Sequence, residues 1–153
     1  MINLLHKPIQ DMLITGYTDI TDDILEFMPY HYSYFFKISE KFLRIESYEQ
    51  YSKLKFDTCD SLKWHEYPDE DDWKISFSSV AGILLKSYYY SDISIEKINM
   101  FNCTVSDNCY ICDYAEIILS DGQTIKFDPL HFWGIGVNDS AYKPENSEIT
   151  VID

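Results

Sequence analysis

Apolar and polar residues alternate one by one along several stretches of this chain. The stretches are residues 36–39, 42–48, 53–56, 62–65 and 73–78. Successive side chains of a β-strand point to opposite faces of a sheet, so a period of two is typical of strands with one buried face and one face in water. The chain is therefore predicted to fold around a mostly antiparallel sheet.

Further strands are predicted by composition and by turn residues. Residues 83–90 and 93–100 are rich in β-branched and aromatic side chains, and residues 149–151 could add an edge strand. Asp121-Gly122 separates two alternating runs, which is the signature of a type I′ hairpin. A two-residue loop there would pair Ile118 with Ile125.

One short helix is expected near the start of the chain. Thr21 can cap it, Asp22 and Asp23 suit the positive end of its dipole, and Pro29 would end it after residues 24–28. At 153 residues, the chain fits one domain, residues 1–153. The predicted fold class is α+β and β-rich, a mostly antiparallel sheet with one or two short helices.

Neither a signal peptide nor a membrane span is predicted. Residues 1–8 lack a charged segment followed by a long apolar stretch, and apolar runs such as residues 80–85 are far shorter than the ~20 residues that span a bilayer. We therefore expect a cytoplasmic protein. In that reducing compartment, its four cysteines, Cys59, Cys103, Cys109 and Cys112, are expected to remain free thiols.

Two motifs are candidates for metal binding, redox exchange or catalysis. Cys109 and Cys112 form a C-x-x-C, but a structural zinc site typically needs a second such pair or two spaced histidines, and a redox pair should open a helix. Asp128 lies three residues before His131, as a carboxylate that orients an imidazole could, yet no nucleophile motif accompanies them. We expect no enzyme, no metal and no cofactor, with ordinary thiols and a turn aspartate as the simpler interpretation.

A pair of glycines resembles part of a nucleotide-binding motif. Gly134 and Gly136 lack the third glycine of a dinucleotide fingerprint, because Asp139 stands in its place. We expect these glycines to permit close backbone packing instead.

Acidic residues dominate the charge. There are 26 Asp and Glu against 12 Lys and Arg, a net charge of −14, which argues against binding nucleic acid or anionic membranes. Five carboxylates fall within residues 66–72, between Trp64 and Trp73, and would lie at a hairpin tip if the flanking strands pair. These carboxylates are explained by a solvated loop that keeps the protein in solution. They are equally explained by a binding surface for a basic protein, in which aromatic anchors supply affinity and the acidic field speeds encounter. A calcium loop is discounted because its ligand pattern is missing. The predicted partner-binding residues are Asp60, Trp64, Glu66, Asp69, Glu70, Asp71, Asp72 and Trp73.

In size, charge and β-rich pattern the chain resembles the small immunity proteins of bacterial toxin systems, including contact-dependent growth inhibition. The resemblance covers overall character and no specific motif. It implies a protein that binds a cognate toxin domain inside the producing cell; a nuclease toxin would be basic in order to hold phosphates. Alternatives are a nucleic-acid mimic that inhibits a DNA-binding protein, a small enzyme using His131 and Asp128, and an interaction module of another pathway.

Overall fold

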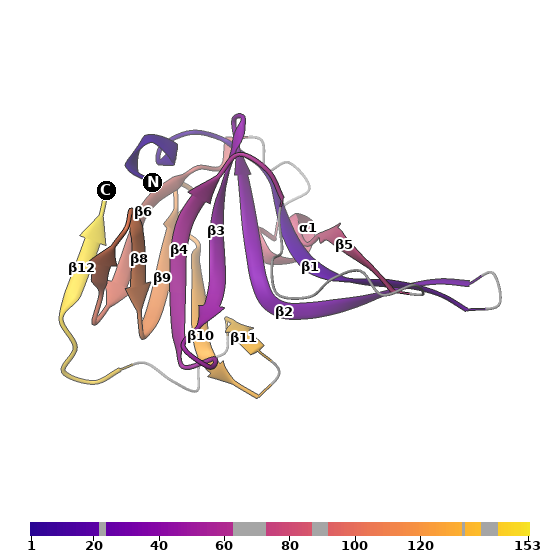
Figure 1. Cartoon of the computed structure of the whole chain (residues 1–153). Helices are drawn as coiled ribbons and strands as arrows, with labels where there is room; N and C mark the ends of the chain where they lie inside the picture. Colours follow the sequence, from indigo (N-terminus) through magenta and orange to yellow (C-terminus); the bar gives the residue numbers. More distant parts are fainter. Residues whose placement is uncertain (22–23, 63–72, 87–91, 133, 139–143) are drawn as a thin grey trace.

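The structure is a computed structural model of the whole chain. It describes residues 1–21, 24–62, 73–86, 92–132, 134–138 and 144–153, and for residues 20, 21, 73 and 74 it describes the backbone only. Strands account for most of these residues (Figure 1). They are β1 (Ile9–Thr21), β2 (Ile24–Ile38), β3 (Lys41–Tyr48), β4 (Lys53–Cys59), β5 (Trp73–Ser79), β6 (Ile95–Phe101), β7 (Thr104–Ser106), β8 (Cys109–Cys112), β9 (Tyr114–Leu119), β10 (Thr124–His131), β11 (Gly134–Val137) and β12 (Ile149–Ile152).

One curled sheet contains all of these strands. Its main order is β12-β6-β9-β10-β11-β2-β3-β4-β8-β7, with β1 paired to β2 and to β5 beside this path. Every strand pairing is antiparallel except a parallel bridge between Gly134 of β11 and His31 of β2. This bridge joins two antiparallel halves of the sheet, so it is the seam of the fold.

The main core lies between the two halves. Strand β3 buries Leu43 and Ile45 and leaves the intervening residues partly exposed, as the period-two pattern predicts. Facing them, β9 and β10 bury Ile117 and Phe127, and all four side chains belong to one cluster. The predicted mostly antiparallel, β-rich fold is confirmed at this level.

Helix is scarce, so the α+β label fits only loosely. Within the part of the chain that the structure describes, helix is confined to α1 (Ala81–Leu84) and a 3-10 turn at Ile2–Leu4. Helix α1 replaces the start of the strand expected at residues 83–90, whose residues 87–90 lie outside the described part. No helix of the described ranges is long and apolar enough to cross a membrane.

The helix expected after Thr21 is wrong. Residues 24–28 belong instead to β2 and pair with β1, where Ile24 lies opposite Thr21 and Leu25 opposite Ile20. The local helix signals are overridden because pairing with a neighbouring strand satisfies the backbone groups of this segment. Pro29 lies within the strand, at a point where the regular pairing stops.

The predicted hairpin after β9 exists, but its predicted register is wrong. Ile125 pairs with Ile117, and Ile118 pairs with Thr124. The connection is longer than two residues, and within it Asp121 Oδ1 accepts a hydrogen bond from the backbone N–H of Gln123 at 3.0 Å. The shift by one residue places Ile117 and Ile125 in the core. The strands expected at 42–48, 53–56, 73–78, 93–100 and 149–151 are present, whereas Leu62 is outside any strand and residues 63–65 lie outside the described part.

Candidate functional site

A kink in β2 creates the most distinctive surface of the molecule. Ile14 of β1 pairs with Tyr34, and Gly16 pairs with Pro29, so residues 30–33 of β2 lie opposite Thr15 alone. Such an excess of residues on one strand is a bulge, which bends the strand and re-aims its side chains. Figure 1 shows the resulting change of direction of β2.

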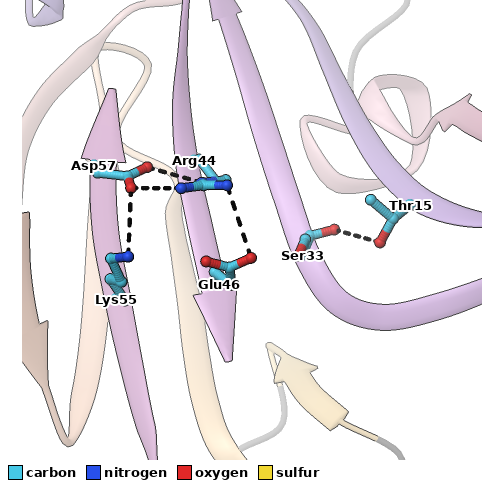
Figure 2. Close-up of polar contacts among 6 residues, drawn as sticks. All are labelled: Thr15, Ser33, Arg44, Glu46, Lys55 and Asp57. Carbon is cyan, nitrogen blue, oxygen red and sulfur yellow. Dashed lines mark hydrogen bonds and ion pairs between the residues drawn. The ribbon is translucent and has the colours of Figure 1, made fainter. Parts of the chain in front are cut away.

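The hydroxyl of Thr15 stabilises the kink. It lies within hydrogen-bond distance of two backbone carbonyl oxygens, that of Ser33 at 3.3 Å (Figure 2) and that of Tyr30 at 3.0 Å. Thr15 and Ser33 are fully buried and Tyr30 is half-buried, so the Ser33 carbonyl has little access to water. A buried hydroxyl that serves the backbone in this way replaces the ladder hydrogen bonds lost at the bulge.

Glycines allow the strands to approach closely around the kink. A Cβ atom at Gly134 would lie 2.5 Å from the backbone oxygen of His31, and Gly134 has a φ of +118°. A Cβ atom at Gly136 would lie 2.9 Å from Cβ of His131, and one at Gly16 would collide with Phe27 and the backbone of Met28. The expectation that Gly134 and Gly136 serve close backbone packing is confirmed.

Beyond the kink, β1, β2 and β5 form an arm that projects from the body (Figure 1). We define the arm as residues 16–21, 24–29 and 73–77. Ile24 and Leu25 on the arm are exposed by 61% and 69%, which is unusual for two adjacent large apolar side chains. Successive side chains of a strand point to opposite faces, so each face of the arm presents one of these exposed apolar side chains, with Ile24 on the same face as Glu26.

The arm also places two carboxylates opposite each other. Asp19 of β1 pairs with Glu26 of β2, and on its other side Asp19 pairs with Trp73 of β5. Like charges directly opposite on neighbouring strands repel, at a cost of about 0.2–1 kcal/mol.

The predicted partner-binding residues are only partly described. Trp64, Glu66, Asp69, Glu70, Asp71 and Asp72 lie outside the described residues, and the expected pairing of the segments carrying Trp64 and Trp73 stays a prediction. The backbone of Trp73 is placed on the arm, and Asp72 precedes it in the chain. The carboxylate of Asp60, exposed by 83%, lies after β4 and 3.5 Å from Lys41 Nζ. Because Trp73 pairs with Asp19, the acidic segment ends at the arm.

A pocket lies at the inner side of the kink. Its volume is about 1110 Å³, slightly above the range of about 300–1,000 Å³ typical of small-molecule sites. Its lining comes from β1, β2, β5, α1 and the seam near β11: Ile14, six residues between 27 and 34, residues 78–80, Ile83, Leu84, His131 and residues 135–137. The arm and the pocket meet at the kink, because Phe27 and Pro29 of the arm also line the pocket.

Two imidazoles face this pocket. His31 Nδ1 is 2.9 Å from the hydroxyl of Tyr34, and burial raises the pKa of Tyr34, which keeps the phenol protonated. Burial lowers the pKa of His31, and positive charge on the nearby His131 lowers it further. Neutral imidazole is thus favoured at His31 when the pocket is empty.

Asp128 and His131 lie in different surroundings in the structure. Asp128 is buried, and its Oδ1 accepts a hydrogen bond from the backbone N–H of Leu130 at 2.9 Å. The expectation of a turn aspartate is wrong, because both residues lie within β10, where the pairing with β11 shifts in register between Asp128 and His131. His131 lines the pocket. His31, its partner there, was missed by sequence reasoning. Tyrosines at every second position around it (30, 32 and 34), directly after a proline, were the available signal.

The four cysteines are free thiols in the structure, as expected. Cys109 and Cys112 are buried on β8, and burial raises the pKa of the Cys112 thiol, which disfavours the thiolate that metal binding and redox exchange require. Within the ranges that the structure describes, no group of three His, Cys, Asp or Glu residues is arranged to hold a metal ion.

A charge network lies on the outer face of β3 and β4. Arg44 Nε and Nη2 donate hydrogen bonds to the two oxygens of Asp57 at 2.9 and 2.7 Å (Figure 2). Glu46 lies 3.8 Å from Arg44, and Lys55 lies 3.9 Å from Asp57. Arg44 and Asp57 face each other across the strand pair, so the network fastens these strands and is structural.

Comparisons with protein-family models, with curated proteins and with solved structures find no match to this chain.

Proposed function

We propose that this protein is a toxin-immunity protein, which binds a basic, nuclease-type toxin domain and neutralises it. The observation that carries the proposal is the arm, which combines exposed Ile24 and Leu25 with the opposed carboxylates of Asp19 and Glu26. Apolar side chains supply most of the free energy of association, and carboxylates speed encounter with a basic partner. The arm thus joins both requirements on one projecting element.

The net charge supports the same partner class. A chain with a net charge of −14 attracts basic proteins over distances set by the ionic strength. A nuclease presents positive charge where it holds phosphates, and an acidic arm can occupy that place. Binding at the catalytic surface of the toxin would block its substrate.

Affinity capture from a lysate of the source organism tests the proposal. Tagged wild-type protein should retain one stoichiometric basic partner at about 0.05 M salt and retain less at about 0.5 M, where the Debye length is under half of its ~10 Å value at 0.1 M. Two variants test the arm, D19K/E26K for charge and I24S/L25S for apolar contact. Each should retain at least about tenfold less partner, equivalent to about 1.4 kcal/mol.

Matched controls come from β7 and the turn that follows it, and β7 is remote from the arm in the sheet order. Val105 is 66% exposed and Asp107 is exposed, so V105S and D107K repeat the same chemistry elsewhere. Both controls should capture the partner as wild type does. No partner at either salt concentration, or equal capture by the arm variants and the controls, would overturn the proposal.

The acidic segment before the arm offers a second test. Charge reversal at Glu70, Asp71 and Asp72 should slow association with the captured partner and flatten its salt dependence, because rim charges act mainly on the association rate. Unchanged association at low salt would exclude this segment from the interface while leaving the arm as its centre.

A further inference from the structure

The lining of the pocket at the kink differs sharply from the rest of the chain. Charged residues make up 25% of the sequence, yet the sixteen described residues that line the pocket include no Asp, Glu, Lys or Arg. Aliphatic side chains and the rings of Phe27, Tyr30, Tyr32 and Tyr34 form most of the wall. Such a wall accommodates a flat, apolar body.

Polar groups lie within this wall as well. The imidazoles of His31 and His131 are its basic groups, and the contact of His31 Nδ1 with the Tyr34 hydroxyl allows the phenol to donate to Nδ1. In that arrangement, Nε2 of His31 carries the hydrogen and is a donor. Two neighbouring imidazoles that repel each other when charged would both be stabilised by an anion placed between them.

From this geometry we infer that the pocket is a binding site for a small aromatic carboxylate, with its ring against the tyrosine and aliphatic wall and its carboxylate at His31 and His131. The site shares Phe27 and Pro29 with the arm, but the inference does not depend on the proposed function. The glycines at 134 and 136 support it, because they bring β11 against the backbone of His31 and the Cβ of His131 and so fix the two histidines relative to each other.

The ionisable groups around the pair determine the direction of the pH dependence. Tyr30, Tyr32 and Tyr34 of β2 line the pocket with His31. Behind the wall, Asp11 of β1 binds Ser79 Oγ at 2.6 Å, and Asp128 of β10 binds the backbone of Leu130. The lining residues of α1 and β11 carry no ionisable side chain. The described lining holds no Lys or Arg, so positive charge for the carboxylate has to come from an imidazole that gains a proton, and carboxylate binding should strengthen as the pH falls.

Three indole derivatives of similar size provide the test, measured by calorimetry on the purified protein at 0.15 M salt. They are indole-3-acetate, indole-3-acetamide and tryptamine, which are anionic, neutral and cationic. Indole-3-acetate should bind most tightly, and its affinity should be about five- to tenfold higher at pH 6 than at pH 8, since one proton taken up changes affinity by up to tenfold per pH unit. The affinity of the acetamide should not change with pH.

Substitutions of single histidines complete the test. His31→Gln and His131→Gln should each weaken indole-3-acetate binding and reduce its pH dependence, while His6→Gln, at a side chain that is 57% exposed beside Glu96, should change neither. Circular dichroism checks that each variant is folded. Tighter binding of tryptamine, pH-independent binding of the acetate, equal effects of all three variants, or no binding of any probe at 5 mM would overturn the inference. None of these results bears on capture of a basic partner by the arm.

Discussion

The hydroxyl of Thr15 lies 3.3 Å from the backbone oxygen of Ser33, at the point where β2 leaves its regular pairing with β1 (Figure 2). The same hydroxyl also contacts the carbonyl of Tyr30 at 3.0 Å. Both the arm and the pocket begin at this kink. A single buried threonine therefore supports the geometry of both surfaces.

Thr15→Val should destabilise the protein by about 1–3 kcal/mol, because it keeps the shape of the side chain but removes the single hydroxyl hydrogen shared by the carbonyls of Ser33 and Tyr30. Urea unfolding measures the change. Thr58→Val, at an exposed position on β4, is the matched control and should change stability by less than about 0.5 kcal/mol. Equal stability of the two variants would show that the hydroxyl does not hold the kink.

Ser33→Ala, unlike Thr15→Val, should not lower the free energy of unfolding. Among the residues that the structure describes, the buried Ser33 Oγ has no hydrogen-bond partner, and burying a hydroxyl without a partner costs about 1–3 kcal/mol. Removing the hydroxyl should leave the free energy of unfolding unchanged or raise it by up to about 1 kcal/mol. A clear loss of stability in the same urea experiment would mean that this hydroxyl has a partner.

Asp57→Asn should destabilise the sheet by about 2–3 kcal/mol, because it leaves the guanidinium of Arg44 largely buried without its bidentate anion. The side chains of Arg44 and Asp57 are only 12% and 18% exposed. Asp60→Asn removes a carboxylate of the same kind that is 83% exposed beside Lys41, and it should cost less than about 1 kcal/mol. Similar losses in the two variants would contradict a structural role for the Arg44 network.

His131→Gln should raise the pKa of His31. Burial lowers the pKa of His31, and positive charge on His131 lowers it further, so only the second effect is removed. A group with a depressed pKa contributes stability that is complete above its unfolded pKa of about 6.5 and is lost as the pH falls through its folded pKa. The variant should therefore lose less stability on acidification below pH 6.5. Titration of the imidazole signals by NMR gives the pKa directly, with His6→Gln as control, and an unchanged pKa of His31 would contradict the coupling.

Local patterns in the sequence predict the body of the fold but not its kink. Period-two alternation places Leu43, Ile45 and Phe127 in the core, because burial of one face of a strand is a property of each segment alone. The connection after β9, in contrast, is closed by backbone hydrogen bonds between Leu119 and Gln123 and between Gly122 and Leu119, with Gly122 at a φ of +86°, so Ile125 pairs with Ile117. The Asp-Gly pair alone does not distinguish this loop from a two-residue loop.

The arm and the pocket both depend on contacts between segments that are distant in the sequence, and these contacts could not be predicted from local patterns. Residues 24–28 of the arm are predicted as a helix because Thr21, two aspartates and Pro29 are good helix signals, and pairing with β1 overrides them. His131 was singled out beside Asp128, but its proximity to His31 results from the seam at Gly134. Only a long-range pairing brings these histidines to one pocket.

Rescue of growth is the measurement that tests the central claim most directly. The gene of the captured basic partner is induced in a laboratory bacterium, alone or together with wild-type protein, the arm variant D19K/E26K or the control V105S. The account predicts that the partner alone arrests growth, that wild type and V105S restore it, and that the arm variant does not. A partner that leaves growth unaffected, or an arm variant that restores growth as fully as wild type, would contradict the account.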